Sequence, residues 1–194
     1  MLYSESDEEI IILYKNGKEE ALKCLINRYS SSLFNFTARL TNKNTANDIV
    51  QETFIKVWKN LHKFNTEKAN FKTWIFTIAK NTAIDFLRKS GSASGGKKSI
   101  NFSDIDNEED FSFSENIPDE NLLPNEILQK LQDSELFNKT LDKLPTHYKT
   151  VLILHYQEEM TFDEIGKILN KPLNTVKSYH YRAIIELKKL LTKK

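Results

Sequence analysis

The chain has 194 residues, of which 39% are hydrophobic and 28% are charged, and its net charge is +1. Its longest apolar runs, Ile10–Leu13 and Val151–Leu154, are far shorter than the roughly 18 residues of a membrane-spanning helix, so we expect no membrane insertion. The first ten residues are rich in Asp and Glu, which is not the pattern of a secretory signal, and we expect a cytoplasmic protein. Cys24 is the only cysteine, which excludes an internal disulfide and a zinc site built on paired cysteines. With five Gly and four Pro in the chain, helix is the expected structure.

Charge divides the chain into three parts. Residues 1–90 hold 14 basic and 10 acidic residues, a net charge of +4, and residues 126–194 hold 12 and 9, a net charge of +3. Residues 91–125 hold 2 basic and 8 acidic residues, a net charge of −6, and this segment opens with the small-residue run SGSASGG that starts at Ser90. We therefore expect an all-α protein with two small helical domains, 1–90 and 126–194, joined by a flexible acidic linker. The linker is either a solvated spacer or a segment that occupies a basic channel on a partner.

Residues 48–62 predict an amphipathic helix in the first domain. Helical spacing assigns one set of apolar residues to its buried face: Val50, Phe54, Val57, Trp58 and Leu61. The remaining surface carries acids, an amide, a lysine and one isoleucine: Asp48, Gln51, Glu52, Ile55 and Lys59. An acidic helix face is commonly just solvated, but an isoleucine among acids also suits a docking site.

A second helix is predicted at residues 70–89, after the short polar loop Lys63–Ala69. One side of this helix is expected to carry Phe71, Ile75, Ile78, Ala79, Thr82 and Phe86, and a different side Thr77, Asn81, Asp85 and Arg88. Basic residues also line it at Lys72, Lys80 and Lys89. Cations interleaved with aromatic and amide groups suit single-stranded nucleic acid, because phosphates need charge and unstacked bases need flat partners. The alternative is that Phe71, Trp74 and Phe86 are simply core residues.

The second domain contains stronger start and stop signals. Thr161-Phe162-Asp163-Glu164 fits a capping box, so a helix is expected to begin near residue 161 and to end near Asn170. Gly166 is small enough for a second helix to pass closely. Pro172 is expected to start the last helix, because the missing N–H of a proline is tolerated there. The acid pair Glu158-Glu159, just before this helix, is expected to face solvent.

The last helix combines an apolar side with a polar and basic one. Its core side is expected to carry Val176, His180, Ala183, Leu187 and Leu190, and its outer side Thr175, Lys177, Ser178, Tyr181 and Arg182. A short helix, a tight turn and a long helix form a helix-turn-helix, whose second helix reads base edges in the major groove. Residues 174–194 hold six Lys or Arg against Glu186 alone, an excess that can neutralise phosphates. The alternative is an ordinary helical hairpin with a basic, solvated face.

Three stretches in order resemble the extracytoplasmic-function sigma factors of bacterial RNA polymerase. The family's helix that docks on the polymerase clamp is similar to NDIVQETFIKVW (47–58). The next helix, which melts and reads the −10 element, is similar to FKTWIFTIAKNTAIDFLRK (71–89). The family's second module, which reads the −35 element, is similar to residues 144–191. The resemblance covers nearly the whole chain and implies a subunit that directs promoter recognition, promoter melting and transcription initiation.

The resemblance also implies roles for individual residues. The residues implied to contact core RNA polymerase are Asp48, Gln51, Glu52 and Ile55. The residues implied to contact the −10 element of promoter DNA are Lys63, Phe64, Asn70, Lys80, Asn81, Asp85 and Arg88. The loop at 63–70 is implied to help capture a flipped base. The residues implied to contact the −35 element are Asn174, Thr175, Lys177, Ser178 and Arg182. An anti-sigma factor is a further partner in this family.

The sequence departs from the family pattern in the last helix. Tyr179 and Ile184 stand where two arginines are expected, and His180 occupies an apolar position. Losing two cations is expected to weaken duplex binding and to flatten its salt dependence, since each neutralised phosphate adds about 0.9 to the slope. We expect His180 to lie at the edge of the core.

No motif in the chain indicates an enzyme, a cofactor or a metal site. The sequence lacks a phosphate-binding glycine loop, HExxH and GxSxG, and its four histidines stand at non-ligand spacings: His62, His147, His155 and His180. Two alternative functions remain: a free-standing helix-turn-helix regulator that binds duplex DNA without polymerase, and a helical protein–protein adaptor. The basic last helix favours DNA binding over the adaptor.

Overall fold

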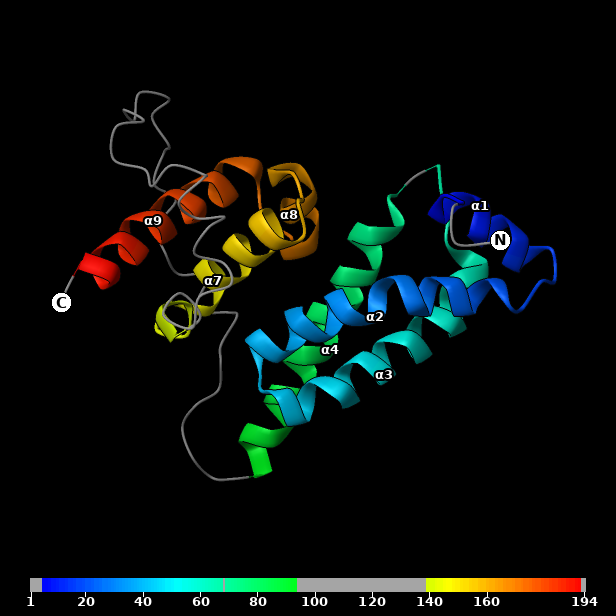
Figure 1. Cartoon of the computed structure of the whole chain (residues 1–194), viewed down its shortest axis with the longest axis horizontal. Coiled ribbons are helices and arrows are strands. Elements are labelled where there is room, and N and C mark those ends of the chain that lie inside the picture. Colours follow the sequence, from blue (N-terminus) through cyan, green and yellow to red (C-terminus); the bar gives the residue numbers. More distant parts are fainter. Residues whose placement is uncertain (1–4, 68, 94–138, 193–194) are drawn as a thin grey trace. The chain divides into compact units, whose positions relative to one another are not determined.

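The computed structural model of the chain describes residues 5–67, 69–93 and 139–192 (Figure 1). Every element in these ranges is helical, so the expected all-α class is confirmed. The described residues fall into two compact units, unit 1 up to residue 93 and unit 2 from residue 139. The acidic linker expected at 91–125 lies, from residue 94 on, outside the described residues.

Unit 1 is a bundle of three long helices with a short helix before them. The elements are α1 (Asp7–Lys15), α2 (Ala21–Leu40), α3 (Lys43–Asn60), the 3-10 turn η2 (Leu61–Lys63) and α4 (Phe71–Ala93). Helices α2, α3 and α4 pack against one another in pairs, and α1 packs on α2 (Figure 1). Fully buried side chains from all three long helices fill the core, and the Phe36 and Phe76 rings meet edge to face at 5.2 Å.

Helix α1 was not predicted, although its start carries a clear capping signal. The Ser6 hydroxyl accepts from the Glu9 amide, and the Glu9 carboxylate accepts from the Ser6 amide, which completes a capping box. Ile10 and Ile11 are fully buried. The run of isoleucines around position 11 therefore anchors a short helix to the bundle.

The buried face of α3 differs from the predicted one by part of a turn. Val57 and Leu61 are buried as expected, but Trp58 is 54% exposed. Ala46, Ile49 and Thr53 are the other buried residues of α3, whereas Val50 and Phe54 of the predicted face are only half-buried. Thr53 can be buried because its hydroxyl donates to the Ile49 carbonyl at 2.7 Å, so its polar group is satisfied within the helix. A pattern that counts only apolar residues misses such a position.

Helix α4 buries part of the predicted face, but Ile78 of that face is half-buried and lines a pocket, and Phe76 and Ala83 from outside it are buried. Phe71, Ile75 and Ala79 are buried as predicted, whereas Phe86 is 38% exposed. The helix continues to Ala93, past the predicted end at residue 89 and into the small-residue run. Small polar residues thus do not end this helix where the sequence pattern placed its end.

Unit 2 is built around a helix-turn-helix. Its elements are α7 (Thr146–Leu152), the π-helical turn η5 (Ile153–Gln157), α8 (Phe162–Leu169) and α9 (Leu173–Thr192). Both α7 and α8 pack on α9 (Figure 1). One core cluster joins the segment before α7 to α9 through Leu141, Leu144, Leu152, Ala183, Ile184 and Leu187.

The acid pair before α8 does not behave as predicted. Glu159 is exposed and adopts a left-handed backbone with φ 55°, but Glu158 is buried. The π-helical turn ends at Gln157, and the Glu158 amide donates to the Ile153 carbonyl. This wider turn places Glu158 against the core instead of in solvent.

Candidate nucleic-acid interface

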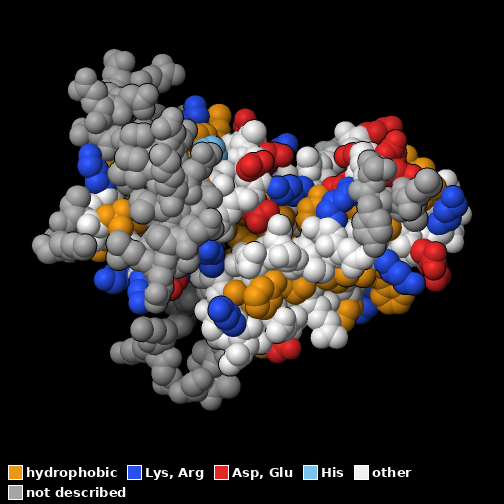
Figure 2. Space-filling view, in the orientation of Figure 1, with side chains coloured by type: hydrophobic (Ala, Val, Ile, Leu, Met, Phe, Trp, Pro, Cys, Tyr) orange, Lys and Arg blue, Asp and Glu red, His pale blue; other side chains and the backbone are white. Residues whose placement is uncertain are grey.

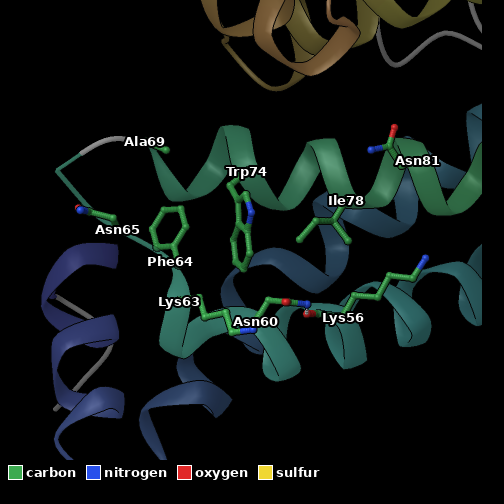
Figure 3. Close-up of a pocket in the computed structure, with 9 residues that line it drawn as sticks. All are labelled: Lys56, Asn60, Lys63, Phe64, Asn65, Ala69, Trp74, Ile78 and Asn81. Carbon is green, nitrogen blue, oxygen red and sulfur yellow. Dashed lines mark hydrogen bonds between the residues drawn. The ribbon is translucent and has the colours of Figure 1, made fainter.

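A pocket of about 570 Å³ opens between α3, α4 and the loop that joins them (Figure 3). Antiparallel packing of the two helices brings residues near the end of α3 opposite the first half of α4. The lining residues are Lys56, Asn60, Lys63, Phe64, Asn65, Ala69, Trp74, Ile78 and Asn81. None of these described lining residues is acidic, so the pocket suits an anionic or neutral ligand.

Aromatic rings form one wall of this pocket. The ring centroids of Phe64 and Trp74 lie 4.6 Å apart with their planes 31° from parallel (Figure 3). Phe71 meets Phe64 edge to face at 5.7 Å from the core side. Phe64 is buried and Trp74 is half-buried, so the exposed part of the indole is a flat apolar surface facing the cavity. A surface of this kind can stack an unpaired base.

Amides and lysines surround the aromatic wall. The Lys56 ammonium donates to the Thr82 hydroxyl at 3.0 Å, which ties α3 to α4. Asn60 is held by its side-chain bond to the Lys56 carbonyl at 2.8 Å. The Asn65 side chain accepts from the Glu67 amide at 2.8 Å, which shapes the start of the loop. The pocket thus combines cations for phosphate with amides that can hydrogen-bond to base edges.

Three of the residues predicted for the −10 element line this pocket: Lys63, Phe64 and Asn81. Asn70 instead caps the start of α4, where its side chain lies 3.4 Å from the Thr73 amide. Lys80 is only 8% exposed and is not among the lining residues; burial lowers its pKa. Asp85 and Arg88 are exposed further along α4.

The residues predicted for the −10 element leave out several lining residues, of which Trp74 and Lys56 matter most. The sequence leaves Trp74 open as a core residue or as part of a nucleic-acid surface, and its half-buried ring packs on Phe64 while lining the pocket. Lys56 and Asn60 are four residues apart and therefore share one face of α3. This spacing is the sequence signal that could have identified them. What the sequence did not specify is which face of α3 meets α4.

The outer face of α3 carries the residues predicted to bind polymerase. Asp48, Gln51 and Glu52 are exposed, and Ile55 is 36% exposed. Trp58 lies three residues beyond Ile55, so two apolar side chains extend the acidic face by one turn. Figure 2 shows a band of hydrophobic side chains over α2 and α3 on the side of unit 1 in view. An apolar surface with acids beside it is suited to docking on a basic partner.

The helix-turn-helix of unit 2 follows its sequence signals closely. The Thr161 hydroxyl accepts from the Glu164 amide at 3.3 Å and the Glu164 carboxylate accepts from the Thr161 amide at 2.8 Å, which confirms the capping box. Asn170 ends α8 in a left-handed conformation with φ 55°. Helix α9 begins at Leu173, one residue later than predicted, and the Pro172 carbonyl accepts its first helical bond from Val176.

The first turns of α9 present a polar surface. Asn174 is exposed, and the other residues predicted for the −35 element are half-exposed: Thr175, Lys177, Ser178 and Arg182. Asn174 and Ser178 lie on the side of α9 opposite the fully buried Val176, Ala183 and Leu187, and the other three flank that side. The spacing and the exposure leave this surface available to a groove of duplex DNA.

Tyr179 and Ile184, which stand where the family pattern has arginines, are core residues of unit 2. Both side chains are buried, and the Tyr179 ring packs 4.9 Å from the His147 ring. Side chains at these two positions face the core of unit 2. The departures therefore shape the packing under α9, and their effect on the salt dependence of duplex binding stays a prediction.

His180 lies at the edge of the core, as expected. Its Nε2 is 2.8 Å from the Tyr156 hydroxyl, and its ring contacts His155 and Phe162. Burial, helped by repulsion from His155, lowers the pKa of His180 to about 4. The imidazole is thus neutral at physiological pH.

The described part of the chain shows neither a metal site nor a membrane-spanning helix. No group of three or more His, Cys, Asp or Glu side chains in them is arranged to hold a metal ion. None of the helices in the described ranges is long and apolar enough to cross a membrane.

Two family models match the chain. The model described as Sigma-70 region 2 matches residues 25–93, and the model described as Sigma-70, region 4 matches residues 134–187. The first contains α3, α4 and the pocket, and the second contains the helix-turn-helix.

Curated relatives and a solved structure agree with these matches. The ECF RNA polymerase sigma factor SigW of Bacillus subtilis is 32% identical over 180 residues, covering 91% of this chain and 92% of SigW. The ECF RNA polymerase sigma-E factor of Haemophilus influenzae is 28% identical over 178 residues, covering 92% and 91%. The sigma factor RpoE of Bartonella quintana, solved in complex with the anti-sigma factor NepR, shares the fold with a TM-score of 0.64 at 24% identity, covering 90% of this chain and 98% of the other.

Proposed function

This chain belongs to the extracytoplasmic-function (ECF) family of RNA polymerase sigma factors, and we propose that three separate surfaces of its own residues perform that function. These are the outer face of α3, the pocket between α3 and α4, and the first turns of α9. Sigma factors are not a family of enzymes, so RNA synthesis itself is the work of the polymerase. We assign the action of the protein to the cytoplasm, with bacterial core RNA polymerase and promoter DNA as partners.

The pocket is assigned to the melted −10 element, and its composition carries the proposal. A flat wall of Trp74 over Phe64 offers stacking, and the amides of Asn60 and Asn81 offer hydrogen bonds. Lys63 is exposed at the rim and can meet the phosphates. Extruding a base costs a few kcal/mol, and stacking contributes about 1–3 kcal/mol per base, so the two are of comparable size.

The outer face of α3 is assigned to the polymerase clamp. Asp48 and Glu52 are exposed one turn apart, and Ile55 and Trp58 continue the surface as exposed apolar side chains. Acids steer a basic partner, while the apolar pair supplies area that is removed from water on docking. Trp58 is an addition to the residues predicted from the sequence.

The start of α9 is assigned to the −35 element. Asn174 and Ser178 can hydrogen-bond to base edges in a major groove, and Lys177 and Arg182 can neutralise phosphates or read guanine. The proposed division of labour follows the domain limits 1–90 and 126–194, with the linker at 91–125 spanning the two elements. An anti-sigma factor that covers the polymerase-binding face is a further proposed partner.

A pair of double variants tests this assignment of surfaces. Asp48→Lys with Glu52→Lys should abolish co-purification with core RNA polymerase, because two favourable charges become repulsive. Lys177→Ala with Arg182→Ala should keep polymerase binding and reduce transcription from a promoter that depends on its −35 element. The matched controls are Glu19→Lys with Glu20→Lys, and Lys139→Ala with Lys143→Ala, which change exposed charges elsewhere.

The proposal requires that the Asp48/Glu52 variant lose polymerase binding and that the Lys177/Arg182 variant lose only transcription that depends on the −35 element. If both bound polymerase and transcribed as the wild type does, the assigned surfaces would be wrong. A full chain that bound duplex DNA tightly and ignored core polymerase would instead be a free-standing regulator.

A further inference from the structure

Helix α1 precedes residues 25–93, which the region 2 family model matches, yet it is built firmly into unit 1. Asp7 pairs with Arg28 of α2 at 2.5 Å and also accepts a hydrogen bond from the Tyr29 hydroxyl. Tyr29 in turn meets Phe71 edge to face at 5.5 Å. The N-terminal end of α1 is thereby linked through α2 to the aromatic residues behind the pocket.

The other end of α1 reaches the pocket wall directly. The Lys15 ammonium donates a hydrogen bond to the Phe64 carbonyl oxygen at 2.5 Å, across 49 positions of sequence. One residue earlier, the Tyr14 ring packs 5.1 Å from the ring of His62 in η2. Both contacts are made with the segment that leads from α3 into the loop.

Phe64 is the point at which the chain leaves helical geometry. Its backbone is extended, with φ −66° and ψ 132°, directly after η2. A carbonyl at such a position lies outside the repeating bonds of a helix and needs a separate donor when it is partly buried. Lys15 supplies that donor with a charged group, which makes the bond stronger than one between neutral partners.

We propose that Lys15 is a positioning residue for promoter melting: by holding the Phe64 carbonyl, it fixes the aromatic wall and the start of the loop at 65–70 before DNA arrives. This inference rests on the assignment of the pocket to the melted −10 element. A pocket that is ordered in advance loses less conformational entropy when it takes up a base. At the far end of the loop the Asn70 cap has the same effect.

The first arm of the test uses the free full-length protein and measures amide hydrogen exchange. The reporters are three amides that donate within this segment, those of Phe64, Glu67 and Ala69. Lys15→Met should raise their exchange rates about tenfold, since a charge-assisted bond that closes the segment is lost. Lys18→Met removes an exposed lysine from the turn after α1 and should change nothing, and Lys15→Arg should restore most of the protection.

The second arm uses holoenzyme and a promoter fragment with 2-aminopurine in the non-template strand of its −10 element. Lys15→Met should slow the fluorescence rise of strand opening roughly three- to tenfold while the affinity for core polymerase stays unchanged. Lys18→Met again serves as the control for charge.

The outcomes separate the two levels of the proposal. Unchanged exchange in Lys15→Met would show that Lys15 does not hold the loop. Faster exchange with normal strand opening would reduce the contact to a structural one and overturn the positioning role. If wild-type holoenzyme opened no promoter, the proposed function would fail, and the positioning role would fall with it whatever the exchange rates showed.

Discussion

Gly166 of α8 lies so close to the backbone of Lys171 that a β carbon built on it would be 2.9 Å from the Lys171 carbonyl oxygen. The two residues are also joined by a hydrogen bond from the Lys171 amide to the Gly166 carbonyl at 3.0 Å. This approach closes the turn between α8 and α9, with Asn170 in a left-handed conformation between them. The direction in which α9 leaves the turn therefore depends on residue 166 being a glycine, which has no side chain. The positions of Lys177 and Arg182 depend on it in turn.

Gly166→Ala should therefore destabilise unit 2. The gain in helix propensity, about 1 kcal/mol, is outweighed by displacement of a backbone carbonyl, and we expect a net loss of about 1–3 kcal/mol. Urea unfolding followed by circular dichroism measures this loss. Lys167→Ala, at an exposed position of the same helix, is the control. A Gly166→Ala protein as stable as the wild type would mean that the turn is not held by this contact.

The histidine at the core edge makes unit 2 sensitive to acid. The unfolded chain takes up a proton at His180 near the usual pKa of about 6.5, whereas the folded chain does so only near 4. Stability is therefore lost as pH falls from about 6.5 to 4, by roughly 2 kcal/mol between pH 7 and pH 5. NMR titration of the His180 ring should report a pKa near 4. In His155→Gln the pKa of His180 should rise, because one of its two causes is removed; titration of the wild-type ring near 6.5 would contradict this account.

Local signals in unit 2 could be predicted from the sequence because they act over a few residues. The capping box at Thr161, the end of α8 at Asn170 and the start of α9 near Pro172 each depend on side chains and backbone within one turn. Their positions are correct to within one residue. The family pattern suggested roles for the exposed residues, which remain proposals, but it did not predict the burial of Tyr179 and Ile184, which depends on how α7 packs on α9.

In unit 1, the sequence predicted the helices around the pocket better than the faces that form it. The sequence left Trp74 open as a core residue or part of a nucleic-acid surface, and its half-buried ring both packs on Phe64 and lines the pocket. The assignment of Trp58 to the core failed, because α3 packs against α2 and α4 at once. A helix with two neighbours buries a wider arc, and small polar residues such as Thr53 can then enter the core. The contact of Lys15 with Phe64 joins residues 49 positions apart, so a local sequence pattern cannot predict it.

The pocket assignment predicts a loss of strand opening without a loss of polymerase binding. Lys63→Ala with Asn81→Ala removes one phosphate partner and one hydrogen-bonding amide, and both side chains are exposed, so folding should be unaffected. We expect promoter opening by the holoenzyme to fall by roughly tenfold or more, since each lost contact is worth about 0.5–1.5 kcal/mol. Permanganate footprinting of the −10 element gives the readout. Asn35→Ala on α2 is the control, and equal footprints for all three proteins would rule the pocket out.

The α9 surface predicts a change in salt dependence. Lys177→Ala and Arg182→Ala should each lower the slope of log affinity against log salt by about 0.9 if each contacts one phosphate. Holoenzyme binding to a duplex that contains the −35 element, measured across a salt series, gives the slope. Lys143→Ala, an exposed lysine before α7, should leave it unchanged. Slopes equal to that of the wild type for both α9 variants would remove these residues from the DNA interface.

Run-off transcription from a pool of genomic fragments, with core RNA polymerase alone and with the full-length protein added, tests the central claim most directly. We expect the protein to co-purify with core polymerase and to produce new, discrete start sites whose upstream sequences share two conserved elements. If added protein left the pattern of transcripts unchanged while core polymerase remained active with another sigma factor, its role as a promoter-specificity subunit would be contradicted.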